Sequence, residues 1–258
     1  MWDIARRGVG LRSVRTLSVL VTLLAVSACS TPPDRAVNEK ELRTLGRNDQ
    51  AMRARGQAER ELRTTARAYV ERASMPLGLL IVRDHCVPGS GPGWFFQQET
   101  DDFRVVCSMD VTAYYGAGPR DVGDTLDRIL TAGDHGRSGR GVRESRIPFT
   151  HDREGRRLVA FYRGRGTAGR SSRAPESTNL TASGQILSWD ATAGGPTRQL
   201  VEEPYAGPND DPPVSRSVHD PKAATVSGIR KRYGLVFRLR LPHTVYYAVL
   251  KNGHVRTE

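Results

Sequence analysis

The chain has 258 residues, which is enough for one large domain or two small ones. It holds 39 basic and 28 acidic residues, and its net charge is +11 with the six histidines counted as neutral. All but four of the basic residues are arginine, and no known nucleic-acid-binding motif accompanies them, so we expect no nucleic-acid partner.

The first 29 residues have the three parts of an export leader. Four arginines and one acid precede residue 16, and a largely apolar run covers residues 17–28. That run is shorter than the roughly 20 residues a spanning helix needs, and it fits the apolar core of a signal peptide. The leader ends in Val26-Ser27-Ala28-Cys29, which matches the lipobox of bacterial secreted lipoproteins. In these residues the chain resembles a lipoprotein precursor.

The resemblance implies a diacylglyceryl group on the thiol of Cys29, with cleavage leaving Cys29 as the first residue. We therefore expect a signal peptide over 1–28 and a protein that lipid anchors to the outer face of the plasma membrane. Residues 29–36 contain two prolines and charged side chains, which predicts a tether. The pair Arg6-Arg7 leaves twin-arginine export open beside the general secretory route.

The mature chain would have 230 residues. Removing the four basic residues and one acid of the leader leaves 35 and 27, a net charge of +8. This charge fits either an arginine-rich solubilising surface or attraction to anionic envelope polymers. Cys86 and Cys107 then form an even pair in an exported chain, which predicts a disulfide.

Residues 37–258 predict a single α+β domain, with the glycine-rich segment 133–145 as the candidate internal boundary. Apolar residues recur at helical spacing over 37–74, and Asn38 marks the start of this long helix. The segments 77–86 and 102–116 are rich in branched and aromatic residues, which predicts an antiparallel strand pair. A short second helix is expected over 121–133, ending at Gly133.

The loop between the two predicted strands contains three consecutive aromatic residues, Trp94, Phe95 and Phe96. Prolines and glycines around them exclude regular structure. Large rings in a polar loop either fold back over the core or form a contact patch, so these three are candidate contact residues.

The second half of the chain is strand-like. We expect strands over 156–164 and 184–191, a proline-rich surface loop over 203–222, and a hairpin over 233–254. In the hairpin, apolar residues alternate with Arg238 and Arg240, and Pro242-His243 falls at the turn. The predicted fold is α+β, with a long N-terminal helix and a short second helix packed on a mostly antiparallel sheet.

Local catalytic motifs are missing from the sequence. It contains no H-E-x-x-H, C-x-x-C, G-x-S-x-G or S-x-x-K, and its histidines lack metal-binding spacing, so we expect no cofactor or metal. Residues 164–169 spell G-x-G-x-x-G, but no helical periodicity follows, so we interpret them as a turn. The sequence favours a non-enzymatic binding or accessory module that contacts anionic envelope polymers or an envelope protein. The alternative is an envelope hydrolase whose site is assembled from distant residues.

Overall fold

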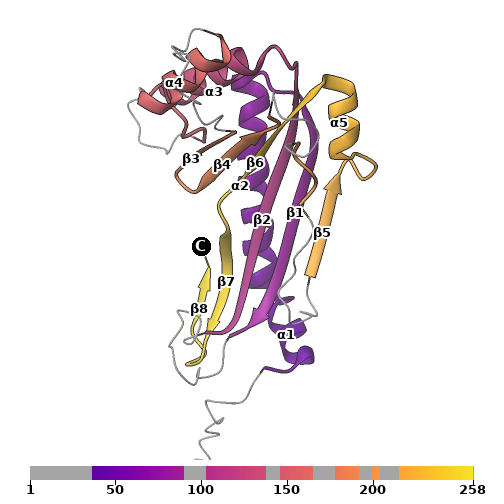
Figure 1. The fold of residues 1–258 in the computed structure, drawn as a ribbon. Helices are drawn as coiled ribbons and strands as arrows, with labels where there is room; N and C mark the ends of the chain where they lie inside the picture. The colour runs from indigo at the N-terminus through magenta and orange to yellow at the C-terminus, as the bar shows by residue number, and fades with distance from the viewer. Residues whose placement is uncertain are drawn as a thin grey trace, which may run out of the picture. The chain divides into compact units, whose positions relative to one another are not determined.

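The computed structural model describes residues 37–89, 103–137, 146–164, 178–191, 199–203 and 215–257. These residues form five helices and one antiparallel sheet of eight strands (Figure 1). The predicted α+β class is therefore confirmed. None of the helices in these ranges is long and apolar enough to cross a membrane.

The N-terminal helical region contains two helices where the sequence predicts one. Helix α1 spans Glu39–Leu45 and helix α2 spans Asp49–Ala73. The break has a local cause, because Gly46 ends α1 and the Asn48 side chain caps α2 by accepting a hydrogen bond from a first-turn N–H. The predicted start is confirmed, since Asn38 caps α1 in the same way.

Helix α2 lies along strands β1 and β2 and buries mainly small side chains (Figure 1). Two buried hydroxyls fix it there: Tyr69 donates to Gln185 Oε1 at 2.6 Å, and Tyr115 of the sheet donates to the Ala66 carbonyl at 2.8 Å. The buried residues of α2 are Ala51, Ala54, Ala58, Leu62, Ala66, Ala68, Tyr69 and Ala73.

The centre of the sheet is the strand pair that the sequence predicts. Strand β1 (Leu77–Pro88) pairs with β2 (Phe103–Ala117) over nearly its whole length. The other strands extend this pair on both sides: β3 (Asn179–Ala182), β4 (Gln185–Trp189), β5 (Ser215–Asp220), β6 (Leu235–Arg240), β7 (Thr244–Leu250) and β8 (Val255–Thr257). The order is β3-β4-β6-β2-β1-β5, and β7 lies between β2 and β8.

The C-terminal region is not the hairpin that its sequence predicts. Strands β6 and β7 both run antiparallel to β2, β6 beside residues 112–117 and β7 beside 103–109. They are two halves of one interrupted strand. Pro242 lies at the interruption, where its missing N–H disturbs the ladder least. Pro242-His243 therefore breaks a strand and does not reverse the chain.

Helix α3 spans Val122–Arg137 and continues past Gly133, where the sequence predicts its end. A Cβ on Gly133 would lie 1.8 Å from the Phe149 carbonyl oxygen. This glycine therefore allows close approach of the backbone and does not end the helix.

The predicted strand over 156–164 is wrong, because helix α4 spans Arg153–Tyr162. Asp152 caps it, and its buried side chains include Leu158 and Val159. A short apolar run fits a buried helix as well as a strand, and here the capping residue decides. The predicted loop over 203–222 is also shorter than expected, because its end forms β5.

The two faces of the sheet carry separate apolar cores. Helices α2 and α3 cover one face, which we call the α2 face; helix α5 (Val226–Tyr233) covers part of the other, the α5 face. Side chains alternate between them along β1, so Val82 belongs to the α2 core and Ile81 to the α5 core. The side chains of any two consecutive residues of β1 therefore point to opposite faces of the sheet.

Candidate functional site

The two cysteines of the described region are joined as the sequence predicts. Cys86 of β1 and Cys107 of β2 are direct partners in the strand register, and a disulfide links them. The bridge spans 21 residues of sequence, which corresponds to roughly 3 kcal/mol in the chain-entropy description. Both side chains face the α2 core, so the bridge lies inside the fold.

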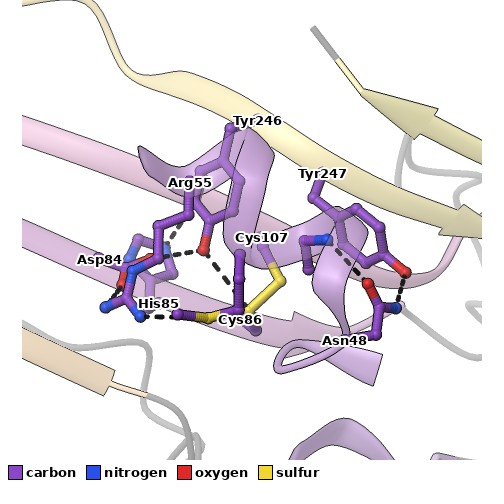
Figure 2. Close-up of a disulfide and its surroundings, with 11 residues drawn as sticks. Asn48, Arg55, Asp84, His85, Cys86, Cys107, Tyr246 and Tyr247 are labelled. Carbon is purple, nitrogen blue, oxygen red and sulfur yellow. Dashed lines mark hydrogen bonds and ion pairs between the residues drawn. A yellow bond between two sulfur atoms is a disulfide. The ribbon is translucent and has the colours of Figure 1, made fainter. Parts of the chain in front are cut away.

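A buried ionic network adjoins the disulfide on the α2 face (Figure 2). Asp84 is 2% exposed; Arg55 of α2 forms an ion pair with its carboxylate, and Tyr246 of β7 donates a hydrogen bond to it at 2.6 Å. The Tyr246 hydroxyl lies 3.9 Å from the Cys86 sulfur. Burial, and then the Asp84 charge, raise the pKa of Tyr246, which keeps the hydroxyl protonated as a donor. The network joins one helix to two strands around the bridge.

A β-bulge in β7 lets two consecutive tyrosines reach this face. The register shifts between Cys107 and Ser108, so Tyr246 and Tyr247 both enter the α2 core. Tyr247 accepts a hydrogen bond from the side chain of Asn48 at 2.6 Å (Figure 2). Since Asn48 also caps α2, the bulge positions the start of that helix.

Four polar residues gather on the opposite, α5 face of the sheet, and we call them the histidine cluster: His85, Ser108, Asp110 and His243. The Ser108 Oγ lies 3.0 Å from His85 Nε2, and Asp110 Oδ1 lies 3.0 Å from His243 Nδ1. The two imidazole ring centres are 6.0 Å apart. Strand alternation places Ser108 and Asp110 on one face, and the interruption between β6 and β7 brings His243 beside them.

The two histidines of the cluster have pKa values shifted in opposite directions. Burial lowers the pKa of His85 and outweighs the opposing charge of Asp110. The hydrogen bond with Asp110 raises the pKa of His243, and the same bond lowers the pKa of Asp110. Near the ordinary histidine pKa of about 6.5, the site therefore presents a neutral imidazole beside a protonated one.

The cluster is not a complete catalytic triad. In a triad the carboxylate contacts the second nitrogen of the same imidazole that contacts serine. Here Asp110 contacts His243, and the buried Nδ1 of His85 has no hydrogen-bond partner in the described part of the chain. Ser108 is also only 3% exposed. The geometry suits hydrogen bonding and proton exchange better than attack by the serine.

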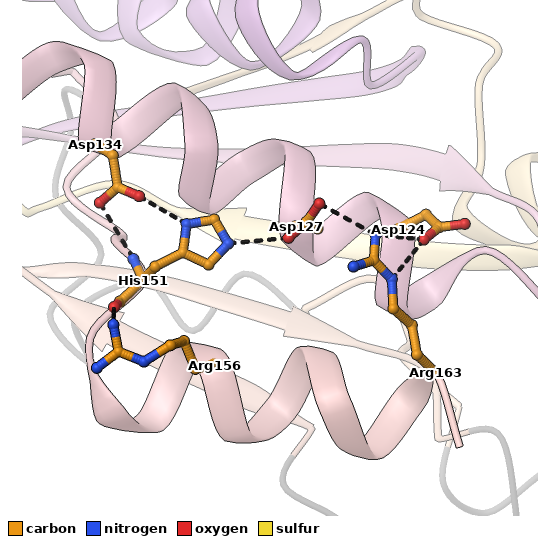
Figure 3. Close-up of polar contacts among 6 residues, drawn as sticks. All are labelled: Asp124, Asp127, Asp134, His151, Arg156 and Arg163. Carbon is orange, nitrogen blue, oxygen red and sulfur yellow. Dashed lines mark hydrogen bonds and ion pairs between the residues drawn. The ribbon is translucent and has the colours of Figure 1, made fainter. Parts of the chain in front are cut away.

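A third histidine, His151, lies between two carboxylates of α3 (Figure 3). Its Nδ1 is 2.6 Å from Asp134 Oδ2, and its Nε2 is 3.0 Å from Asp127 Oδ1. Partial burial opposes its charge, but these hydrogen bonds prevail and raise its pKa. Arg163 contacts Asp124 and Asp127 at the other end of α4. With both ring nitrogens occupied, His151 acts as a clamp between α3 and α4.

The glycine-rich segment 164–169 lacks the context of a nucleotide site. Gly164 follows helix α4, whereas a dinucleotide fingerprint follows a strand. A dinucleotide fingerprint also has an acid about 20 residues further on, and Asp190 stands there. Asp190 is 4% exposed and accepts hydrogen bonds from Arg230 of α5 through both carboxylate oxygens, at 2.8 and 2.9 Å. Asp190 therefore has a structural role, because both of its carboxylate oxygens already have a partner within the fold.

The remaining predicted site residues, Cys29 and the aromatic group Trp94, Phe95 and Phe96, lie outside the described residues. In the part of the chain that is described, no group of three or more histidine, cysteine or acidic side chains could hold a metal ion. An open hollow of about 910 Å³ lies along α1, lined by residues between Asn38 and Asn48, and includes none of the histidine cluster.

Sequence reasoning missed the histidine cluster and the Asp84 network, because their members are far apart in the chain. The one local signal is Arg83-Asp84-His85, three polar residues inside an otherwise apolar strand. Comparisons with protein-family models, curated proteins and solved structures found no match to this chain.

Proposed function

We propose that this protein is a lipoprotein anchored through Cys29 to the outer face of the plasma membrane, where it serves as a non-enzymatic binding or accessory module of the cell envelope. The proposal rests on the different roles of the three cysteines of the chain. Two of them, Cys86 and Cys107, pair inside the fold, which fits an oxidising compartment. The third, Cys29, ends the lipobox-like sequence.

The free energy of burying acyl chains in the bilayer would account for a stable lipid anchor at Cys29. Each buried methylene contributes about 0.8 kcal/mol, and two acyl chains attach a protein stably where one is marginal. The tether 29–36 would then separate the lipid from α1, which begins at Glu39. Envelope polymers carrying anionic groups are the partners that the net positive charge favours.

A binding role fits the polar chemistry better than catalysis does. The ionic groups of the described core are occupied in structural pairs, as with Asp84 and Arg55 or Asp190 and Arg230. At a pH of about 6.5 the histidine cluster offers a neutral and a charged imidazole, which together recognise hydrogen-bonding or anionic groups.

The test is substitution of Cys29 in the full-length chain. Cys29→Ala should abolish labelling by radioactive acyl chains and move the protein from the membrane fraction to the soluble one. The double variant Cys86→Ala/Cys107→Ala, which leaves Cys29 intact, should remain in the membrane fraction. Retention of Cys29→Ala in the membrane after a carbonate wash would overturn the proposal.

A second candidate function, an envelope hydrolase, is favoured by one observation: the 3.0 Å contact between Ser108 Oγ and His85 Nε2. Such a contact is the first requirement for an activated serine nucleophile. A serine-directed fluorophosphonate probe should then label the wild type, but neither Ser108→Ala nor His85→Gln. If the wild type is not labelled while a known serine hydrolase in the same reaction is, this candidate fails.

A further inference from the structure

Helix α2 carries three arginines on its outer face at seven-residue intervals: Arg53, Arg60 and Arg67. All three are exposed, and we call them the arginine stripe. A rise of about 1.5 Å per residue places the Cα atoms of successive arginines about 10.5 Å apart along the axis, and a seven-residue repeat drifts only about 20° around it. The stripe therefore faces one direction over 14 residues of helix.

The arginines of the stripe differ from Arg55 and Arg63 of the same helix, because they have no carboxylate partner in the described part of the chain. No ion pair joins Arg53, Arg60 or Arg67 to any residue that the structure describes. On the same helix, Arg55 is paired with Asp84, and Arg63 is paired with Glu59 and Asp220.

The residues that lie between the three arginines on this face, Gln57 and Thr64, are uncharged. Gln57 donates a hydrogen bond at 3.1 Å to Glu61, an exposed acid at the edge of the face. Arg60 lies over Gly56, where a Cβ would be 3.3 Å from its Nη1. The acids Asp49 and Glu71 lie beyond the two ends of the stripe. Over its central length this face therefore carries three cations, with one acid, Glu61, at its edge.

The helix under the stripe is held rigidly. Its opposite side packs on the sheet through alanines, and Tyr69 and Tyr115 fix it with buried hydrogen bonds. A rigid helix backbone adds no ordering cost of its own when a partner binds, so only the arginine side chains lose conformational freedom. Guanidinium groups also suit phosphate and carboxylate oxygens, because their planar forks donate two hydrogen bonds at once.

We propose that the arginine stripe is the surface through which the anchored protein binds a linear anionic polymer of the cell envelope. The length of the stripe matches an extended chain lying along the helix and exceeds what one small anion could cover. This inference rests on the proposed envelope location and names the contact surface for it.

The experiment measures binding of the full-length lipidated protein, in neutral detergent micelles, to long-chain inorganic polyphosphate. The triple variant Arg53→Gln/Arg60→Gln/Arg67→Gln should bind about 10- to 100-fold more weakly at low salt, since each exposed contact contributes modestly. Its affinity should also depend less steeply on salt, because fewer counterions are released. Glutamine has a helix propensity close to that of arginine, so α2 should be retained, which circular dichroism checks.

A matched control removes the same charge elsewhere. Arg120, Arg153 and Arg256 are exposed on other elements, so Arg120→Gln/Arg153→Gln/Arg256→Gln lowers the net charge equally. This control should lose less than about threefold in affinity, because it changes only the long-range field. Orthophosphate at equal phosphate concentration should compete poorly, because it cannot bridge successive arginines.

Equal losses in the two triple variants would overturn the proposal, as would strong competition by orthophosphate. It would also fail if the stripe variant lost binding only to vesicles of anionic phospholipid, which would make the stripe a membrane contact. The anchor is tested separately: Cys29→Ala reports on location, and the stripe variant keeps Cys29. If the proposed anchor fails its test, the test of the arginine stripe can still be interpreted, and the reverse also holds.

Discussion

At the scale of single residues, the stretch Arg83-Asp84-His85 links both polar sites of the sheet. Asp84 points into the α2 core, where Arg55 and Tyr246 satisfy its carboxylate; His85 points to the α5 face and contacts Ser108. A buried charge without a partner is very unfavourable. The three residues of the Asp84 network should therefore behave as one energetic unit.

We predict that Arg55→Met lowers the free energy of unfolding by about 3–5 kcal/mol, because it leaves a buried carboxylate unpaired. The double variant Arg55→Met/Asp84→Leu should recover most of this loss, since an apolar pair can replace a buried ion pair at little cost. Urea unfolding of the full chain measures both, with the exposed pair variant Arg43→Met as a control expected to change stability by less than about 1 kcal/mol. A loss that small for Arg55→Met would contradict the prediction.

The two histidines of the cluster should titrate on opposite sides of the ordinary pKa of about 6.5. NMR titration of the imidazole resonances should place His85 below that value and His243 above it. Asp110→Asn removes the hydrogen-bonded charge and should return the pKa of His243 toward its ordinary value.

The stability that His243 contributes has a definite pH dependence. Its pKa is raised in the folded state, so its contribution is complete below the unfolded-state pKa and is lost as pH rises through the folded one. The unfolding free energy of wild type relative to Asp110→Asn should therefore fall across this range. An unchanged difference would show that the Asp110–His243 bond is not formed in solution.

At the scale of elements, α5 contacts the sheet over two glycines. A Cβ on Gly78 of β1 would lie 2.5 Å from the Ile229 side chain, and one on Gly116 of β2 would lie 2.1 Å from the Tyr233 ring. These glycines permit the close contact of helix and sheet that completes the α5 core. Sequence patterns did not identify α5, because it has only eight residues and three apolar positions, which are too few to distinguish a helix from a loop even at helical spacing.

We predict that Gly116→Ala destabilises the protein by about 1–3 kcal/mol, because the added methyl group displaces the Tyr233 ring. Gly56→Ala is the matched control. It lies within α2, where a Cβ meets only the flexible end of Arg60, so it should stabilise by about 0.5–1 kcal/mol. Thermal unfolding compares the two, and a neutral Gly116→Ala would show that α5 packs less closely than the structure indicates.

At the scale of the whole molecule, the disulfide joins the two longest strands near the end where β7 and α2 also meet them. Cys86→Ser/Cys107→Ser should lower the unfolding free energy by about 2–4 kcal/mol. The mature protein should also show no thiol that reacts with maleimide until it is reduced, since Cys29 would carry lipid. A reactive thiol without reductant would contradict the proposed anchor chemistry if it is Cys29, and the bridge if it is Cys86 or Cys107.

The sequence by itself determined the central strand pair, the pairing of Cys86 with Cys107 and the helical start at Asn38. Each depends on a local pattern: alternating and branched apolar residues, cysteine count, or a capping side chain. The break between α1 and α2 was not predicted, because it depends on the capping of α2 by Asn48.

Only the tertiary structure decided how the C-terminal half is arranged. The local pattern fits pairing of β6 with β7 as a hairpin. In the structure both strands pair with β2 instead, which is long enough to hold them end to end. The histidine cluster follows from that choice, because His243 reaches Asp110 only when the strand is interrupted beside β2. Such contacts join residues more than 100 positions apart, and no local pattern encodes which partners meet, since alternation specifies a face of a strand but not its neighbour.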